Sequence, residues 1–233
     1  YSDEPGNQGL AITPRDSILD VARQAGQAGF QVCTHAIGDA ANRLVLDLYE
    51  ELLGELKLDD PRWRVEHAQI LHPDDLPRFA GLGVIAAMQP VHCTSDMDWA
   101  DKRLGPNRLG GAYAWRSLLD SGARLCFGTD FPVEHVNPLA GLYAARTRMH
   151  PDGTPAGGWY PEQCLDGRTA LTLYTAGSAY AAFQEDLLGR IAVGFLADLT
   201  VLDADPTVCA PEELLQDQVR LTIVAGRLAY RRE

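Results

Sequence analysis

The side chains best suited to chemistry in this 233-residue sequence each come shortly after a strand-like stretch. They are His35 after Phe30–Thr34, His67 after Arg64–Glu66, Gln89 after Val84–Met88 and Asp130 after Arg124–Phe127. In a parallel βα fold the carboxyl ends of the strands lie at one edge, where active sites are built. Imidazole and carboxylate groups are ligands of catalytic zinc, which keeps one position open for water. The pattern therefore predicts a metal-dependent hydrolase site.

Each histidine taken alone has a blander interpretation, because a histidine after a strand is usually a surface residue or a hydrogen-bonded core residue. Three ligand types at equivalent strand ends, His35, His67 and Asp130, favour the metal site. A metal ion acidifies its bound water toward neutral pH, and a neighbouring aspartate can take the proton and pass it to a leaving group. Asp130 is therefore the candidate catalytic residue.

The segment after Gln89 should also lie at the active edge, and we expect an irregular loop over roughly residues 90–108. His92 and Asp96 in this segment, together with Gln89, are candidate substrate-binding residues. A polar loop held by local hydrogen bonds is an open alternative for His92 and Asp96. Cys93 beside His92 suggests a thiol nucleophile, but no second base or oxyanion arrangement supports that reaction.

Composition excludes several classes of protein. Lys and Arg number 20 against 32 Asp and Glu, which gives a net charge of −12 and argues against a basic groove for nucleic acid. No run approaches the roughly 20 apolar residues of a membrane span. The five cysteines are odd in number and show no spacing pattern, which favours a reducing compartment, so we expect a cytoplasmic protein.

The chain is expected to be an α/β protein with a boundary near residue 185. Before the boundary, helices are predicted over about residues 16–28, 40–56, 72–80, 113–120, 138–149 and 168–183, interleaved with the strand-like stretches. After it, residues around Gly189 and Gly194 and the stretches 198–203, 220–224 and 227–230 are typical of β-structure, the last two joined by Ala225-Gly226. A barrel of eight βα units takes about 250 residues, so four units make half a barrel.

Five stretches resemble the amidohydrolase superfamily, in particular the branch that contains N-substituted formamide deformylase. They are Thr34-His35-Ala-Ile-Gly-Asp39, Val65-Glu66-His67-Ala68-Gln69, Met88-Gln89-Pro90-Val91-His92, Phe127-Gly128-Thr129-Asp130-Phe-Pro-Val-Glu134 and Gly189-Arg-Ile-Ala-Val-Gly-Phe-Leu-Ala-Asp198-Leu-Thr-Val-Leu-Asp203. They follow one another in the family's order across nearly the whole chain.

The resemblance implies a (β/α)8 TIM-type barrel with one or two divalent metal ions, usually zinc. It implies that His35 and His67 are metal ligands from strands five and six, and that Asp130 is the strand-eight ligand and proton shuttle. Gln89 and His92 would lie on the substrate side of strand seven. The implied reaction is hydrolysis of an amide-type C–N bond by a metal-activated water.

Two features of the family are missing from this sequence. The His-x-His of strand one is absent, and so is the strand-four lysine, since Lys57 and Lys102 lie at a helix end and in a loop. In the family a sequence like Tyr1–Leu10 comes shortly after strand four. We therefore expect the second half of the barrel over residues 1–185 and the C-terminal strands of a small β-sandwich over residues 186–233.

Such a half-barrel would expose strand edges and apolar faces, so we expect it to need its N-terminal half and to have little hydrolase activity without it. The other expected partners are a small-molecule amide-type substrate and a second copy in a homodimer. Two rival hypotheses remain. One is a metal-free, inactive half-barrel that serves as an assembly module. The other is a hydrolase that acts on a cyclic amide, an amidine or an ester.

Overall fold

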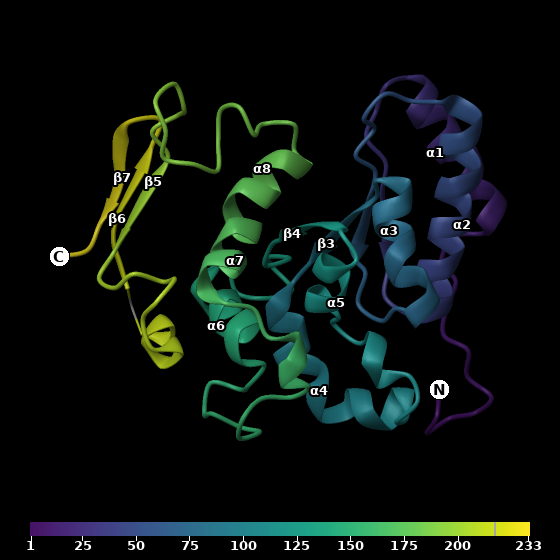
Figure 1. Cartoon of the computed structure of the whole chain (residues 1–233), viewed down its shortest axis with the longest axis horizontal. Helices are drawn as coiled ribbons and strands as arrows, with labels where there is room; N and C mark the ends of the chain where they lie inside the picture. The colour runs from purple at the N-terminus through teal and green to yellow at the C-terminus, as the bar shows by residue number, and fades with distance from the viewer. Residues whose placement is uncertain (217) are drawn as a thin grey trace. The chain divides into compact units, whose positions relative to one another are not determined.

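Figure 1 shows a computed structural model of the chain, which describes residues 1–216 and 218–233. The chain divides into two compact units. The first unit contains Tyr1–Met88 and Asp96–Leu125, and the second contains Gln89–Ser95 and Cys126–Glu233. The boundary near residue 185 stays a prediction, and residues on both sides of it belong to the second unit.

A parallel sheet organises the first unit. Its strands are β1 (Cys33–Ala36), β2 (Arg64–His67) and β3 (Ile85–Met88), and β4 (Arg124–Phe127) follows β3 in the order of the sheet. Strands β1 and β2 are parallel with His35 opposite Glu66, and β2 and β3 are parallel with Glu66 opposite Ala87. The carboxyl ends of β1, β2 and β3 therefore lie at one edge, as the sequence predicts.

Helices connect these strands in the order expected of βα units. They are α1 (Arg15–Gln27), α2 (Asp39–Leu56), the short η1 (Pro73–Asp75), α3 (Leu76–Leu82), η2 (Leu109–Gly111) and α5 (Trp115–Asp120). Helix α2 packs against α1, α3 and β1. It buries Val45, Leu48 and Leu52, which share one helical face.

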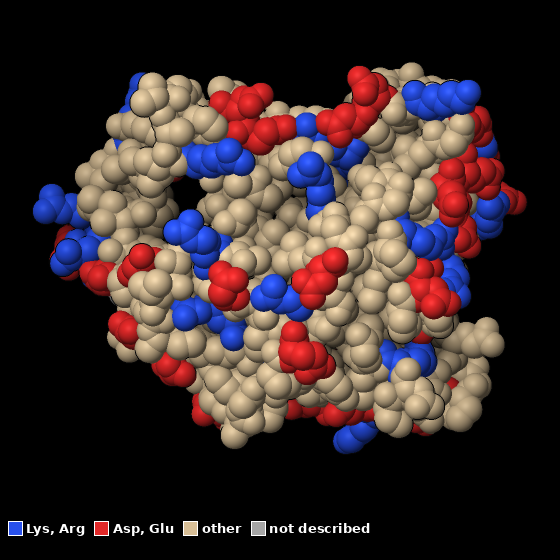
Figure 2. Space-filling model, in the orientation of Figure 1, with Lys and Arg blue, Asp and Glu red and all other residues tan. Residues whose placement is uncertain are grey.

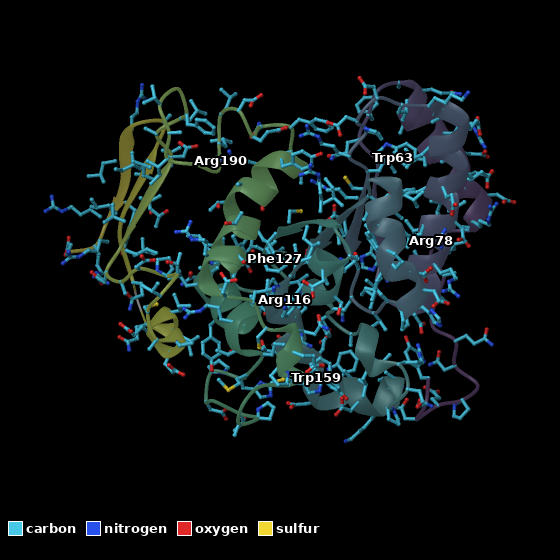
Figure 3. All side chains as sticks on the ribbon, in the orientation of Figure 1. Trp63, Arg78, Arg116, Phe127, Trp159 and Arg190 are labelled. Atoms are coloured by element: carbon cyan, nitrogen blue, oxygen red, sulfur yellow. The ribbon has the colours of Figure 1, made fainter. Side chains whose placement is uncertain are left out.

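The buried side chain of Trp63, labelled in Figure 3, packs against α1 and α2. The indole is fully buried just before β2, and its ring centroid lies 5.0 Å from that of Tyr49 on α2. Gly26 lets α1 approach this ring, because a Cβ at that position would lie 2.9 Å from an indole carbon. The absence of a side chain at Gly26 thus sets the packing distance of α1.

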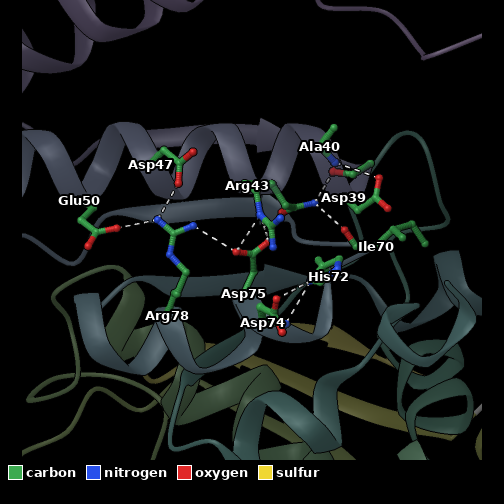
Figure 4. Close-up of polar contacts among 12 residues, drawn as sticks. Asp39, Ala40, Arg43, Asp47, Glu50, Ile70, His72, Asp74, Asp75 and Arg78 are labelled. Carbon is green, nitrogen blue, oxygen red and sulfur yellow. Dashed lines mark hydrogen bonds and ion pairs between the residues drawn. The ribbon is translucent and has the colours of Figure 1, made fainter. Parts of the chain in front are cut away.

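A buried carboxylate ties α2 to the segment that follows β2 (Figure 4). The side chain of Asp75 is only 2% exposed and lies 2.9 Å from Arg43 and 3.1 Å from Arg78. Arg78 also pairs with Asp47 at 2.8 Å and Glu50 at 2.7 Å. Two arginines therefore compensate the buried charge, as burial of a carboxylate requires.

The expected loop over residues 90–108 is wrong for most of its length, because Pro90–Leu104 forms helix α4. Proline is tolerated in the first turn of a helix, so Pro90 does not prevent this start. The buried side chains Cys93, Met97, Ala100 and Leu104 recur at helical spacing. Cys93 and Ala100 are small, which makes the apolar stripe hard to detect in the sequence.

Two smaller differences concern where elements begin. Strand β1 begins at Cys33 rather than Phe30, so His35 lies within the strand. Gly29 has φ 77°, which delays the extended conformation. Helix α1 begins at Arg15 after Pro14 and has no side-chain cap, so Asp16 lies in its first turn instead of capping it.

The helical part of the second unit contains α6 (Leu139–Thr147), η3 (Pro161–Gln163), α7 (Gly167–Thr172) and α8 (Ser178–Ala181). The single helix predicted over residues 168–183 is interrupted between α7 and α8 by a π-helical turn, η4 (Leu173–Gly177). The hydroxyl of Ser178 shares its one hydrogen between the carbonyls of Leu173 at 3.0 Å and Phe127 at 2.9 Å. A side chain that bonds to main-chain carbonyls in this way disturbs the regular ladder of a helix.

A small antiparallel sheet ends the second unit. It contains β5 (Leu199–Leu202), β6 (Val219–Val224) and β7 (Arg227–Arg231) in that order, and η5 (Pro211–Leu215) lies between β5 and β6. The predicted hairpin is confirmed, with Ala225 at φ 49° and Gly226 at φ 75°. The β-structure expected around Gly189 and Gly194 is wrong, because their φ values of 84° and 93° are incompatible with a strand.

The charged side chains, the cysteines and the helix lengths can each be described from the structure. On the face drawn in Figure 2, acidic and basic side chains are interspersed and do not gather by sign. The five cysteines are thiols that form no disulfide in residues 1–216 and 218–233, and Cys93 and Cys126 are buried as small apolar residues. Over residues 1–216 and 218–233, the helices are too short or too polar to cross a membrane.

Candidate functional site

The first unit brings His35 and His67 together at the carboxyl ends of two adjacent strands. The centroids of their rings lie 4.5 Å apart, with the ring planes at 71°. The ring of His67 is half-buried, and that of His35 is exposed. Two imidazoles at this spacing can present nitrogen atoms to one metal ion, so the donor set suits zinc.

The main chain at the end of β2 is strained. His67 has φ 76° and Ala68 has φ 44°, both in the left-handed region that side chains other than glycine seldom adopt. Such a conformation costs on the order of 1–3 kcal/mol and is concentrated at functional sites. The register pairs His67 with Ala36, so regular alternation would turn the side chains of His35 and His67 to opposite faces of the sheet. Their rings nevertheless lie 4.5 Å apart, so regular alternation ends at His67.

The second unit brings His92 and Asp130 together. The Nε2 atom of His92 lies 3.7 Å from a carboxylate oxygen of Asp130, and the side chains are 12% and 36% exposed. Asp130 also has a left-handed backbone, with φ 58°, two residues after Gly128. An imidazole beside a partly exposed carboxylate can stabilise its charge or exchange a proton with it.

A second contact in this unit joins the same two segments. The hydroxyl of Ser95 donates to the carboxylate of Glu134 at 2.7 Å. Glu134 is half-buried, whereas His135 is exposed and its Nδ1 atom accepts a hydrogen bond from the amide of Asn137. Of the neighbours Glu134 and His135, Glu134 is therefore the residue that links the start of α4 to the segment after β4.

Asp96 belongs to a hydrogen-bonded cluster in the first unit. Its carboxylate accepts a hydrogen bond from the Gln69 amide at 2.6 Å and another from the hydroxyl of Tyr113. Gln69 and Tyr113 are buried and also contact each other, and the amide of Tyr113 donates to the carbonyl of Gln69 at 2.7 Å. The cluster ties α4 to the segment that follows His67.

Gln89 and Cys93 are both largely enclosed. Gln89 is 9% exposed directly after β3, and its carbonyl accepts the amide of His92 at 3.1 Å. Cys93 is fully buried within α4, which supports a packing role over that of a thiol nucleophile. On β1, burial raises the pKa of the Cys33 thiol, and the charge of Arg64 opposes that shift only in part.

Sequence reasoning did not single out Gln69, Tyr113 or Asn42. Gln69 is the last residue of the motif that begins at Val65. Asn42 comes three residues after Asp39, the last residue of the motif that contains His35. Those positions were the available signal, because a polar residue within a recognisable motif is a candidate for a role in the site. Tyr113 carries no such signal, since only the fold places it beside Gln69.

The fold and the two histidines at the carboxyl ends of β1 and β2 define a class, an α/β protein built on a parallel sheet. The model of the Amidohydrolase family matches residues 1–230. The chain therefore belongs to the amidohydrolase family of hydrolases, as its motifs predicted.

Two curated relatives illustrate the similarity. The chain is 36% identical over 234 residues to Protein LONG AFTER FAR-RED 3 of Arabidopsis thaliana, covering 99% of this chain and 39% of that protein. It is 31% identical over 225 residues to N-substituted formamide deformylase of Arthrobacter pascens, covering 96% of this chain and 41% of that protein. The chain thus spans about two fifths of the length of these relatives.

Solved structures agree with the α/β fold. An uncharacterized metal-dependent hydrolase from Pyrococcus horikoshii OT3 matches with a TM-score of 0.78 and 32% identity, over 91% of this chain and 41% of that chain. A mutant of atrazine chlorohydrolase TrzN from Arthrobacter aurescens TC1, complexed with zinc and atraton, matches with a TM-score of 0.64 and 25% identity, over 94% and 48%.

Proposed function

We propose that the protein is a metal-dependent hydrolase of amide-type C–N bonds and that His35, His67 and Asp130 are metal ligands. The observation that carries this proposal is the pair of imidazoles, His35 and His67, 4.5 Å apart at the carboxyl ends of neighbouring strands. The left-handed backbone at His67 and Asp130 adds support, because strain of this kind is typical of functional sites.

Zinc is the metal that we propose, in one or two copies. Imidazole and carboxylate ligands suit it, and a similar structure is described as a complex with zinc. A bound zinc ion would acidify water toward neutral pH and polarise a carbonyl group. The residues of this chain would hold that ion and manage the protons of the reaction.

Asp130 is the residue that we propose moves the proton. A carboxylate at this position would take the proton from water and deliver it to the nitrogen that leaves. His92, 3.7 Å away, would stabilise the charge of Asp130 and contact the substrate together with Gln89. Asp96 is also a proposed substrate residue, and its hydrogen bonds with Gln69 and Tyr113 would fix the orientation of its carboxylate.

The substrate proposed is a small molecule with an amide-type bond, by analogy with the relative named N-substituted formamide deformylase. We further propose that residues 1–185 form the second half of a (β/α)8 barrel and residues 186–233 the last strands of a β-sandwich. The matched relatives are more than twice as long as this chain. We also propose that the complete site needs the N-terminal half expected from the sequence and that the assembled enzyme is a homodimer.

Metal content and turnover test this function. The protein is purified with its complementary polypeptide, zinc is measured by elemental mass spectrometry, and hydrolysis of N-substituted formamides is followed. His67→Ala and Asp130→Ala should remove turnover, and His67→Ala should also lower the zinc content. His72→Ala is the matched control, because the His72 ring caps η1, where it accepts the amide of Asp74 at 3.2 Å and lies 3.5 Å from the carboxylate of Asp74.

The opposite outcome is equally clear. Wild-type protein without zinc and without turnover, but with retained binding to its complementary polypeptide, would replace this proposal with the inactive assembly module. Full turnover by Asp130→Ala would reject the role of Asp130 as the proton carrier.

A further inference from the structure

Helix α2 sends two buried polar side chains toward β1 and β2. Tyr49 donates to the carbonyl of Arg64 at 2.9 Å and contacts the hydroxyl of Thr34 at 2.7 Å. Asn42 lies two turns earlier on the helix, toward the end of the sheet where the histidines lie. It is fully buried in the first unit. Tyr49 contacts residues within β1 and β2, and Asn42 contacts main-chain groups at the carboxyl ends of the same two strands.

The amide nitrogen of Asn42 is surrounded by main-chain carbonyls. Its distances to the carbonyl oxygens are 3.3 Å for Ala36, 3.1 Å for Ile37, 3.0 Å for Gly38 and 3.0 Å for Ile70. An amide nitrogen has two hydrogens, so these acceptors share them. The reverse orientation would place the amide oxygen against four other oxygens, so the contacts fix the orientation of the side chain.

The amide oxygen of Asn42 is buried without a hydrogen-bond partner among residues 1–216 and 218–233. An unsatisfied buried acceptor costs free energy, which an apolar residue of similar size would not incur. If stability alone mattered, an apolar residue would therefore be more favourable than asparagine at position 42. What the asparagine supplies is a donor group that reaches two separate loops at once.

Those two loops directly follow the strands that carry the histidines. Ala36, Ile37 and Gly38 directly follow His35, and Ile70 comes three residues after His67. The amide of Ile70 also donates to the carbonyl of Ile37 at 2.9 Å (Ile70 is labelled in Figure 4). Asn42 and this main-chain bond together join the end of β1 to the end of β2, where the two rings lie 4.5 Å apart.

We propose that Asn42 is a positioning residue that holds the rings of His35 and His67 at their mutual distance. Asn42 acts through the two loops and touches neither ring. The consequence for metal affinity rests on the proposed function, whereas the effect on the ring separation does not. Loss of the tie to Ile70 should let the two strand ends move independently.

Two substitutions separate the tie from simple packing. Asn42→Ala removes every donor contact. Asn42→Ser keeps a hydroxyl that can bond back to the carbonyl of Gly38, four residues earlier on the helix, but that is too short to reach Ile70. The serine variant thus retains a local bond and loses the bond between loops, so it tests the proposal if the alanine variant does not fold.

Tyr49→Phe is the matched control. It removes a buried hydrogen-bonding group from the same helix, and its partners Thr34 and Arg64 lie on the strands before the histidines. This variant should lower the stability of the protein without changing the separation of the histidine rings. Both kinds of variant are compared in the protein purified with its complementary polypeptide, free of metal and then titrated with zinc.

The readouts are the nuclear Overhauser effect between the two rings, in protein with labelled histidine, and the zinc dissociation constant from competition with a chromogenic chelator. We expect Asn42→Ser to lose the Overhauser effect and to weaken zinc binding at least tenfold, with Tyr49→Phe like the wild type in both. An unchanged Overhauser effect in Asn42→Ser overturns the proposal, as does an equal loss in Tyr49→Phe. Wild-type protein that binds no zinc overturns the proposed function, and the Overhauser effect still decides the role of Asn42.

Discussion

The imidazole of His92 faces the carboxylate of Asp130 at 3.7 Å, from the first turn of α4 to the segment after β4. If Asp130 carries the proton of the reaction, Asp130→Asn keeps the size of the side chain and removes its basicity. We expect kcat to fall by about 10²–10⁴-fold with a smaller change in KM, because general acid–base catalysis contributes about that much. Steady-state kinetics on an N-substituted formamide measures both constants.

Glu134→Gln is the control for that experiment. Glu134 is a nearby carboxylate on the same segment, and it accepts a hydrogen bond from Ser95 at 2.7 Å. Its neutralisation should lower kcat by less than about tenfold, since the amide oxygen of glutamine can still accept the hydrogen bond of Ser95 and Glu134 has no proposed role in proton transfer. An equal decrease in kcat in Asp130→Asn and Glu134→Gln would contradict the role of Asp130 as the proton carrier.

The cluster of Asp96, Gln69 and Tyr113 gives a second prediction. Tyr113→Phe removes the hydroxyl that donates to Asp96 while preserving the buried ring. The unfolding free energy should fall by about 1.5–3 kcal/mol, the usual value of one hydrogen bond to a charged group. KM should rise as well, because the carboxylate of Asp96 would lose its fixed orientation. A stability loss with unchanged KM, measured by urea unfolding and kinetics on one preparation, would assign the cluster to packing alone.

The strand-end residues could be predicted from the sequence because apolar stretches reveal strands and the fold rule supplies their common edge. His35, His67, Gln89 and Asp130 are found at or just beyond β1, β2, β3 and β4. The left-handed backbone at His67 could not be foreseen, since neither a glycine nor an asparagine marks it. The conformational preferences of single residues do not predict a backbone conformation that tertiary contacts impose.

Contacts between distant segments were also beyond the sequence. Nothing in the local pattern connects Asn42 to Ile70 or Tyr113 to Asp96, because these pairs depend on how loops close over the sheet. Helix α4 was mistaken for a loop for a related reason. Its buried face uses Cys93 and Ala100, whose low hydrophobicity gives a weak periodic signal.

The buried carboxylate of Asp75 supplies a prediction about stability. Asp75→Asn should lower the unfolding free energy by about 1–3 kcal/mol, because Arg43 and Arg78 lose their shared charged partner. The exposed pair Arg15–Glu51 is the comparison, with side chains 46% and 45% exposed. Arg15→Ala should cost less than about 1 kcal/mol. Urea unfolding of both variants checks the contrast, and equal costs would contradict it.

The hairpin between β6 and β7 predicts a stabilising change. Ala225 has φ 49°, a conformation that alanine adopts at a cost and glycine adopts freely. Ala225→Gly should therefore raise the unfolding free energy by about 0.5–1 kcal/mol. Gly226→Ala is the reciprocal change at φ 75° and should lower it by a similar amount. Thermal unfolding of the two variants should shift in opposite directions, and a shift in the same direction would refute the argument from backbone conformation.

Tyr49 predicts how stability changes at alkaline pH. Burial raises the pKa of the Tyr49 hydroxyl above its usual range, and the hydrogen bond with Thr34 opposes the shift. Because the folded-state pKa is raised, the contribution to stability is complete below the ordinary value of about 10 and is lost as the pH rises through the folded-state pKa. The loss is at most about 1.4 kcal/mol per pH unit for one such group. Tyr49→Phe should cost stability at pH 7, yet its stability should fall less steeply than that of the wild type above pH 10. Urea unfolding at several pH values tests this, and parallel curves for the two proteins would show that the hydroxyl of Tyr49 ionises as readily in the folded state as in the unfolded chain.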